Sequence, residues 1–557
     1  MSEAKRTDNQ VLQNKLLKES EMAEEKETPK KLSRREFVKG AAVGAAGATA
    51  AGVLASCAPA ATPAPGQTAA PAATCPPAAE CAPCVDPRMP ETWDEEADVV
   101  VVGCGGAGAA AAITANDAGA KVLVLEKMPV GGGTTALSGG NFSAPKAPLN
   151  LDRVVGYLVA CGKGLVDEEM ATAWAQEAIN VPDWAKALGG DVVESPGPGY
   201  HPQYEGAEEI VSWAPAQATG AEMYKILSDA MNTRGIEVML ETPATELVAT
   251  SEGEVVGVVS ESNGTKLYVK AKRAVILTCG GFDWNDWMKQ QYLRVHPVYS
   301  MASPGNTGDA IAMAGKLGAK LWKISELAGF VAHKFAGDER TWLSMLQFVI
   351  GNFGAIIVSK YGKRFTDETL SYDAYHKALD YFDPATDDYP NVPCYCMFDE
   401  AARLAIPMGY GPGWSADNLE EIEKGWIVKA DTIKELGSKI GIDPETLDST
   451  VSQYNQYCTA GQDPDFGRKA LKAFGAPPYY AIEGYPGTTS TWGGPKINTK
   501  AQVEDTYEQV IPRLYTAGVA SCGVQGFYYP GNGSNLGDCF AFGCIAGWNA
   551  AAEEPWE

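Results

Sequence analysis

A short glycine-rich segment has the residue types and the spacing to bind a phosphate chain. It reads Gly103-Cys104-Gly105-Gly106-Ala107-Gly108, the pattern GxGxxG, and it precedes an alanine-rich helix predicted over residues 109–116. The first glycine permits a tight turn, the second lets the backbone approach a pyrophosphate, and the third lets the helix pack against a strand. The helix N-terminus offers N–H groups and the positive end of its dipole to the phosphates.

The elements around this segment complete the pattern of a dinucleotide site. Residues 98–102 predict a buried parallel strand, and residues 121–125 predict a second strand that ends at Glu126, 23 residues after Gly103. A carboxylate at that distance can accept hydrogen bonds from both ribose hydroxyls. A second glycine-rich stretch, residues 131–140, would let the main chain lie against a large planar ring. That feature suits a flavin better than a nicotinamide.

The composition indicates a folded protein of more than one domain. Of its 557 residues, 45% are hydrophobic and 21% are charged, and the formal net charge is -25. An anionic surface repels a phosphate backbone, and the body of the chain has no strong basic patch, so nucleic acid is not an expected partner. The four histidines, at positions 201, 296, 333 and 376, lack metal-ligand spacing, and no metal site is expected.

Residues 1–57 predict an export signal. Arg34 and Arg35 precede an uncharged stretch of alanine and glycine, residues 40–55, which is too short to span a bilayer. This pattern is typical of the twin-arginine route, and Cys57 ends a segment similar to a lipobox, where it would be lipidated. The expected location is the periplasm or the outer face of the cytoplasmic membrane, with attachment only through that lipid. The alternatives are an amphipathic helix, or ordinary cleavage that discards Cys57.

Residues 58–95 predict an Ala/Pro-rich linker that cannot bury a core. It contains Cys75, Cys81 and Cys84, and the last two have the spacing of a metal or redox motif. Disulfides or free thiols are favoured over an iron–sulfur ligand set, and Val85 excludes a haem attachment motif. Pairing among the other cysteines cannot be deduced from sequence alone.

Several further landmarks resemble the fumarate reductase and succinate dehydrogenase flavoprotein superfamily. They are Glu126-Lys127, residues 274–282, Asn306-Thr307-Gly308-Asp309 and residues 514–518, in the family's order. The resemblance implies an α/β fold in which a Rossmann-type FAD-binding domain is interrupted by an α+β capping domain. The FAD-binding segments would cover residues 96–332 and 491–557, and the cap residues 333–490. Within the cap, Asp443 is expected to cap a helix that extends to residue 459.

The same resemblance implies FAD as the cofactor and indicates which residues contact it. Ala244 would lie by the adenine, and Asp309 and Asn535 would lie nearer the flavin. The implied set is Gly103, Gly105, Ala107, Gly108, Glu126, Lys127, Gly133, Thr134, Thr135, Ser138, Gly139, Gly140, Ala244, Gly280, Asp309, Gly518, Asn535 and Leu536.

The substrate positions differ from those of fumarate reductases. In that branch an Arg donates the proton, and Tyr372 stands at its place in this chain. The relay Glu and Arg would fall near Phe348 and Gly351, and the substrate-binding His falls on Ser490. A dicarboxylate would then enter without a guanidinium partner, at a cost on the order of several kcal/mol per buried unpaired ion. Fumarate and succinate are therefore disfavoured as substrates.

The residues present instead resemble the 3-ketosteroid dehydrogenase branch. Tyr372-Asp373 and Tyr529-Pro530-Gly531-Asn532-Gly533 carry this resemblance. It implies that Tyr372 transfers the proton and that the Tyr529 hydroxyl and the Gly533 N–H bind a ketone oxygen. Neutral donors stabilise the charge that develops on an enone oxygen during hydride addition, and a helix that begins at Gly533 would add to that field.

Other residues around this site remain open. A third tyrosine is expected from the FAD-binding domain, and Tyr200 and Tyr204 are its candidates. His376 lies one helical turn from Tyr372 and would be able to tune it. Any of these tyrosines can instead be a packed aromatic residue whose hydroxyl is hydrogen-bonded.

We therefore expect an exported FAD-dependent oxidoreductase that reduces or forms a C=C bond conjugated to a ketone. Its substrate would be bulky and apolar, such as a 3-oxosteroid, and its electrons would come from a separate membrane-linked or cytochrome donor. One alternative is a reductase of an enoate such as fumarate, urocanate or an aryl acrylate, which would need Arg364 or Arg403 in the site. The other is a flavin-carrying electron-transfer lipoprotein without substrate chemistry.

Overall fold

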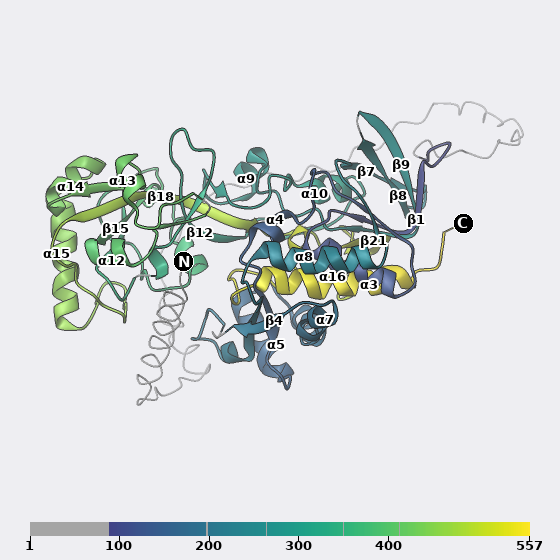
Figure 1. Cartoon of the computed structure of the whole chain (residues 1–557), viewed down its shortest axis with the longest axis horizontal. Coiled ribbons are helices and arrows are strands. Elements are labelled where there is room, and N and C mark those ends of the chain that lie inside the picture. The colour runs from purple at the N-terminus through teal and green to yellow at the C-terminus, as the bar shows by residue number, and fades with distance from the viewer. Residues whose placement is uncertain (1–88, 196–198, 263, 349, 412, 557) are drawn as a thin grey trace, which may run out of the picture. The chain divides into compact units, whose positions relative to one another are not determined.

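The computed structural model describes residues 89–557, except residues 196–198, 263, 349, 412 and 557 (Figure 1). The contacts divide the chain into two units, and all described residues belong to the second, Ala82–Glu557. The predicted twin-arginine signal, the lipidation site at Cys57 and the linker cysteines at 75, 81 and 84 lie outside the described residues.

An eight-stranded sheet forms the Rossmann-type part, with the main path β20-β21-β9-β1-β2-β6 and with β7 and β8 joined to β9. β1 pairs in parallel with β2 and β9, and β21 pairs in parallel with β9. Residues 99–102 of β1 are buried, as expected for a parallel strand covered on both faces. The strands are β1 Glu95–Val102, β2 Val122–Leu125, β6 Glu237–Met239, β7 Ala244–Ala249, β8 Val255–Ser262, β9 Thr265–Leu277, β20 Gln502–Glu504 and β21 Val510–Thr516.

Two helices from opposite ends of the described chain cover this sheet together. α3 (Gly106–Asp117) follows β1 directly, and α16 (Ser534–Ala552) packs along it. Figure 1 shows α3 and α16 side by side, in purple and yellow. The C-terminal segment thus packs against the helix that follows the first strand of the sheet.

A small three-stranded sheet, β3-β5-β4, lies within the first FAD-binding segment and was not foreseen. Its strand β3 contacts α16 and the neighbouring helix α6. The side chain of Asp167 caps α6 by accepting a hydrogen bond from the N–H of Met170. The elements are β3 Phe142–Pro145, β4 Val192–Ser195, β5 Ile210–Pro215, α5 Leu151–Gly162, α6 Glu168–Ala178, α7 Val181–Ala187 and α8 Gly220–Thr233.

The cap is built on a second eight-stranded sheet, with the path β14-β15-β18-β12-β13-β16 and with β10 and β17 paired to β18. The predicted domain boundaries at 332 and 490 fall inside β12 and β18, which pair with each other. Its strands are β10 Tyr299–Ser300, β12 Leu327–His333, β13 Trp342–Ser344, β14 Ala355–Ser359, β15 Cys394–Asp399, β16 Gly409–Tyr410, β17 Val428–Ala430 and β18 Tyr479–Thr491.

The remaining helices and short strands lie in both the cap and the FAD-binding segments. The predicted cap helix is present as α15, with Asp443 accepting a hydrogen bond from the N–H of Thr446. The other elements are α4 Gly133–Leu137, α9 Asp286–Tyr292, α10 Asp309–Gly315, α11 Tyr372–His376, α12 Glu400–Ala405, α13 Leu419–Glu423, α14 Ile433–Ile440, α15 Pro444–Ala460, β11 Leu321–Trp322 and β19 Gly494–Pro495.

Three further features apply to the described part of the chain. The nine cysteines in it are free. It has no group of three or more His, Cys, Asp or Glu side chains that could hold a metal ion. No helix found in it is both long enough and apolar enough for a membrane span.

Candidate active site

One pocket brings together both glycine-rich segments, the cap sheet and the start of α16. It extends from Glu126 and Ala244, where the nucleotide is expected, to Tyr372 and Tyr529, where the substrate is expected. The predicted residues that line it are Gly103, Gly105, Ala107, Glu126, Lys127, Gly133, Thr134, Thr135, Ser138, Gly139, Ala244, Gly280, Asp309, Tyr372, Tyr529, Gly533, Asn535 and Leu536.

The turn after β1 requires glycine for two different reasons. Gly103 has φ +103°, and a Cβ there would lie 2.6 Å from the carbonyl oxygen of Thr278. Gly108 does not line the pocket, because its Cα faces the carbonyl of Gly103, where a Cβ would overlap. Gly108 therefore serves the close helix–strand packing predicted for the third glycine of the motif.

Two other predicted cofactor residues also lie behind the pocket wall. Gly140 has φ +76° and faces the backbone of Thr219, and Gly518 has φ +70° and faces Ala107 and Cys539. Neither lines the pocket, and both support its wall, so their predicted contact with FAD stays a prediction. In both cases a Cβ would collide with neighbouring atoms of the wall.

The carboxylate of Glu126 is fixed at the end of β2. It is buried, and it accepts hydrogen bonds from the main-chain N–H groups of Cys104 (2.8 Å) and Met128 (2.9 Å). This anchors the glycine turn to the strand that follows it. The position agrees with the predicted role of Glu126 at the ribose.

The side chain of Asp309 lies close to this end of the pocket. It forms an ion pair with Lys127 at 2.7 Å, and Thr307 bridges the same two side chains. Lys127 directly follows Glu126, so Asp309 is associated with the nucleotide end. The expectation that Asp309 lies nearer the flavin stays a prediction.

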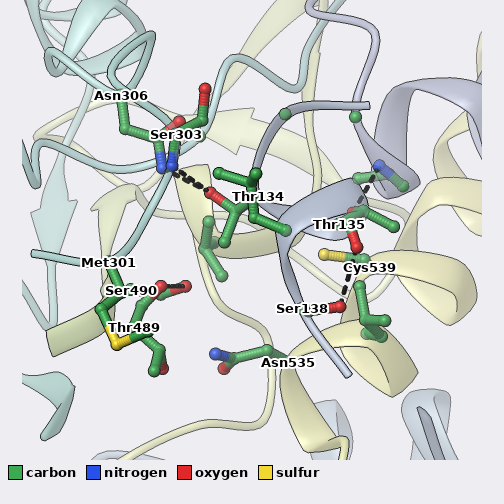
Figure 2. A pocket seen from close by; sticks show the side chains of 18 of the residues that line it. Thr134, Thr135, Ser138, Met301, Ser303, Asn306, Thr489, Ser490, Asn535 and Cys539 are labelled. Carbon is green, nitrogen blue, oxygen red and sulfur yellow. Dashed lines mark hydrogen bonds between the residues drawn. The ribbon is translucent and has the colours of Figure 1, made fainter. Parts of the chain in front are cut away.

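The helix α4 is tied to two neighbouring segments by its threonines. Figure 2 shows the hydroxyl of Thr134 directed at Ser303 and Asn306, whose main-chain and side-chain N–H groups donate to it at 3.0 and 3.2 Å. The hydroxyl of Thr135 accepts a hydrogen bond from the N–H of Gly106 at 3.0 Å. These bonds hold the second glycine-rich segment against the first and form the central wall of the pocket.

Three tyrosines meet at the other end of the pocket. Tyr200, Tyr372 and Tyr529 all line it, with ring centroids 5.7 to 6.0 Å apart. Of the two candidates for the third tyrosine, Tyr200 is the one that lines the pocket. Tyr204 does not line the pocket and instead packs against His201 and Lys163.

Tyr529 is held by the residues around the start of α16. Its hydroxyl oxygen accepts a hydrogen bond from the N–H of Asn535 at 3.2 Å. Its ring stacks on Trp492, whose Nε1–H donates to the Asn535 side chain at 3.0 Å. Gly533 has φ +84°, and a Cβ there would lie 2.5 Å from the backbone of Asn141. α16 begins at the next residue, so the helix N-terminus faces the pocket as predicted.

Burial sets the ionisation of these phenols. It is the largest cause of the raised pKa of Tyr372, Tyr200 and Tyr529. The main-chain N–H groups of Asn535 and Gly533 oppose this effect on the pKa of Tyr529. The three hydroxyls are consequently neutral hydrogen-bond donors at physiological pH.

The two arginines required by the enoate alternative lie outside the pocket. Arg364 is buried in ion pairs with Glu368 (2.7 Å) and Asp463 (3.0 Å), and Arg403 pairs with Glu400 at 2.6 Å. Among the described residues, no arginine lines the pocket.

The other positions that were compared with fumarate reductases differ in whether they line the pocket. Phe348 and Ser490 line the pocket, whereas Gly351 does not. His376 packs against Gly329 of β12, and burial lowers its pKa to about 3, so it is neutral. The predicted influence of His376 on the chemistry of Tyr372 is not supported by a described contact between the two side chains.

Sequence reasoning did not identify most of the apolar wall around the tyrosines. These side chains come from α4, from the segment before Ser303 and from the edge of the cap sheet. No motif marks them, since they converge only in the folded chain. They are Leu137, Met301, Leu343, Met345 and Tyr410.

Comparison with known proteins identifies the family. Residues 98–536 match the family model described as FAD binding domain, and the chain belongs to that family. Urocanate reductase of Eggerthella lenta is 32% identical over 483 residues, which cover 84% of this chain and 76% of that protein. Fumarate reductase (cytochrome) of Shewanella frigidimarina is 31% identical over 476 residues, with 82% and 77% coverage.

A solved structure is also similar across the whole described fold. The crystal structure of 3-ketosteroid delta1-dehydrogenase from Sterolibacterium denitrificans, in complex with 1,4-androstadiene-3,17-dione, has a TM-score of 0.75 and 26% identity. The match covers 82% of this chain and all of that chain. These findings confirm the α/β fold and the FAD cofactor, which the glycine turn and Glu126 fit. The protein is an FAD-dependent oxidoreductase that acts on CH–CH bonds.

Proposed function

We propose that this enzyme reduces, or forms, a C=C bond conjugated to a ketone in a bulky apolar substrate such as a 3-oxosteroid. The observation that carries the proposal is the cluster of Tyr200, Tyr372 and Tyr529 in a pocket whose described lining contains no arginine. FAD, when bound, supplies hydride transfer to or from a substrate carbon. The chain's own residues must then bind the carbonyl and move the proton.

Binding of the ketone oxygen is assigned to the hydroxyl of Tyr529. Its hydroxyl oxygen already accepts the N–H of Asn535, so its own hydrogen is available to a substrate carbonyl. The N-terminus of α16 lies directly behind it and favours negative charge at that place. A neutral donor in this field stabilises an enolate oxygen without a charged partner on the substrate.

Proton transfer to or from the substrate is assigned to the hydroxyl of Tyr372. Its ring lies 6.0 Å from that of Tyr529 and 5.7 Å from that of Tyr200, so its hydroxyl can serve the same small substrate region. Burial raises its pKa, which keeps it protonated and able to donate to the carbon next to the ketone. Dehydrogenation would use the reverse transfer to the same oxygen.

The apolar wall supports the substrate size. Leu343, Met345, Phe348 and Tyr410 reach the pocket from the cap side, and Met301 reaches it from the segment before Ser303. Phe348 is 60% exposed and Tyr410 is 49% exposed, so both retain apolar surface for a ligand to cover. A bulky hydrocarbon frame would bury this surface, whereas a small diacid would not.

The second candidate is an enoate reductase, which is favoured by the identity to urocanate and fumarate reductases. A carboxylate needs a cation in the site. Lys127 is the only cationic residue of the described lining, and it is paired with Asp309. Ser490, Thr489 and Asn532 offer neutral donors only. The site chemistry therefore supports the ketone more strongly.

The test uses the FAD-loaded protein, photoreduced without oxygen and mixed with candidate oxidants. Steroids with a 3-oxo-4-ene or a 3-oxo-1-ene group are expected to reoxidise the flavin rapidly, as followed by its visible absorbance. Fumarate and urocanate serve as the comparison. Rapid reoxidation by either enoate, with none by any enone, would overturn the proposed substrate class.

We further propose that the enzyme works outside the cytoplasm. The twin arginine and the lipobox-like segment support export and a lipid anchor at Cys57, and electrons would then come from a membrane-linked or cytochrome donor. Cell fractionation tests this: replacing Arg34 and Arg35 with lysine should leave the protein in the cytoplasm. Replacing Cys57 with alanine should release it from the membrane. Cytoplasmic location of the unaltered chain would refute export.

A further inference from the structure

A buried carboxylate lies directly behind the tyrosine cluster and has no role in the reaction assigned so far. Asp373 follows Tyr372 in α11 and is 2% exposed. Its Oδ2 accepts a hydrogen bond from the main-chain N–H of Tyr529 at 2.8 Å. The carboxylate thus connects the helix that carries one catalytic tyrosine to the backbone of the other.

The charge of this carboxylate is only partly compensated. Oδ1 has no hydrogen-bond partner among the described residues, and the nearest cation-forming group is Nε2 of His201, 3.5 Å from Oδ2. His201 is also 2% exposed, and its ring lies against that of Tyr528, with the centroids 4.4 Å apart and the planes tilted by 31°. A carboxylate with a single amide donor acts on neighbouring groups more strongly than one that is fully hydrogen-bonded, because the protein interior screens charge weakly.

The surroundings of Asp373 consist mainly of phenols. They come from α5, the loop before β5, α11 and the segment before α16. The negative charge of Asp373 adds to burial in raising the pKa of Tyr372, Tyr200 and Tyr529. The ionisable groups around it are Tyr157, Cys161, Tyr200, His201, Tyr372, Tyr375, His376, Tyr528 and Tyr529, and Lys163 lies farther out against Tyr204.

We propose that Asp373 is a positioning residue for this site: its carboxylate holds the main chain of Tyr529, and its buried negative charge acts on the phenols that surround it. The inference rests on the proposed function for the reaction that the cluster serves. Reduction consumes a proton from a neutral phenol, whereas dehydrogenation needs the phenolate. Burial already keeps these phenols neutral at physiological pH, and the charge of Asp373 moves their ionisation, and with it the change from reduction to dehydrogenation, further toward alkaline pH.

The first test is the pH profile of enone reduction by the Asp373→Asn variant. Asparagine retains an oxygen for the N–H of Tyr529 but removes the charge. Since a negative neighbour raises the pKa of a phenol, its removal lowers that pKa. The alkaline fall of the reduction rate and the alkaline rise of the dehydrogenation rate should both move to lower pH.

A matched control separates charge from architecture. Asp399 is also buried, and it also holds main-chain N–H groups, those of Ala402, Gly354 and Gly475, but it does not line the pocket. In Asp399→Asn, the alkaline fall of the reduction rate and the alkaline rise of the dehydrogenation rate should stay at the same pH, even if the variant destabilises the cap. These two changes of rate are called the two limbs of the pH profile below. Loss of rate in Asp373→Asn without movement of either limb would show a merely structural role and contradict the proposal.

A second variant compensates the charge without removing the carboxylate. His201→Lys places an ammonium beside Asp373, and it should move the limbs in the same direction as Asp373→Asn. If Asp373→Asn does not fold, this variant still decides the question. Unmoved limbs in His201→Lys would then overturn the proposal.

A spectroscopic titration makes the test independent of turnover. The ultraviolet difference between the FAD-loaded chain and its Tyr372→Phe variant isolates the ionisation of one phenol. In the Asp373→Asn background that ionisation should occur at lower pH. Equal titration in the two backgrounds would refute the inference. If this shift is observed while no enone is reduced, the proposed function fails and the role of Asp373 stands.

Discussion

The hydroxyl oxygen of Tyr529 accepts a hydrogen bond from the main-chain N–H of Asn535, at 3.2 Å, in the first turn of α16. A phenol in this arrangement can still donate its own hydrogen, and Tyr529 lines the pocket. The same N–H offsets part of the burial that raises the pKa of Tyr529. Helix, amide and phenol therefore form one polar unit that is suited to a ketone oxygen.

Tyr529→Phe should remove the donor and retain the ring that stacks on Trp492. Because one oxyanion donor contributes about 10²- to 10³-fold in kcat, the rate of enone reduction should fall by about that factor. Stopped-flow reoxidation of the reduced flavin measures this. Tyr479→Phe is the control, since Tyr479 does not line the pocket and its hydroxyl binds the carbonyl of Gly475. A fall below about threefold would show that Tyr529 does not bind the carbonyl.

Tyr372→Phe should abolish proton transfer while leaving FAD binding intact. General acid catalysis contributes about 10² to 10⁴ in rate, and a loss of that size is expected for every enone that the enzyme accepts. Exchange of the substrate α-proton with deuterated solvent, followed by NMR, should also stop. If turnover with all acceptors stayed at the wild-type rate, the tyrosines would only pack, as in a flavin-carrying electron-transfer protein.

The nucleotide half of the site could be predicted from sequence because its signals are local. Gly103, Gly108 and Glu126 occupy one strand–turn–helix–strand unit, and their spacing alone fixes their geometry. The contact of Asp309 with Lys127 joins residues 182 positions apart in the sequence. No spacing rule predicts such a contact.

Prediction of the substrate half of the site depended on the resemblance to a known family, and part of it needed the tertiary contacts. Tyr372 and Tyr529 were assigned by motif, whereas the choice between Tyr200 and Tyr204 needed the fold, because both lie in an irregular loop without periodicity. The apolar residues Met345 and Tyr410 sit in or beside short strands whose pattern matches ordinary packing. The sheet β3-β5-β4 was missed because its strands have only four to six residues.

Replacement of Arg364 and Arg403 tests the enoate alternative. Both guanidinium groups form ion pairs with acids outside the pocket, so Arg403→Gln should leave the KM of any substrate unchanged. Arg364→Gln breaks a buried pair, and it should lower the thermal midpoint because such a loss costs about 3 to 5 kcal/mol. Substrate affinity of the remaining folded protein should not change. A tenfold rise in KM for an enoate in either variant would place that arginine in the substrate site.

Glu126→Gln tests the nucleotide end. The carboxylate accepts two main-chain N–H groups and faces the expected ribose, and charge-assisted hydrogen bonds contribute about 1.5 to 3 kcal/mol each. FAD affinity should fall by at least about tenfold. Retention of flavin on gel filtration, followed by fluorescence titration, measures this loss. Glu246→Gln on the exposed part of β7 should retain wild-type affinity, and equal retention by both variants would argue against ribose binding by Glu126.

Phe348 offers a test of substrate size that is independent of the chemistry. It lines the pocket and is 60% exposed, so a bulky apolar ligand would cover it, and Phe348→Ser should remove about 1 to 2 kcal/mol of that contact. KM for a steroid should rise by about 5- to 30-fold, with kcat changed little because the reacting groups are untouched. Leu404→Ser is the matched control, since Leu404 is 65% exposed and does not line the pocket. Equal KM values in the two variants would mean that the substrate does not reach the apolar wall.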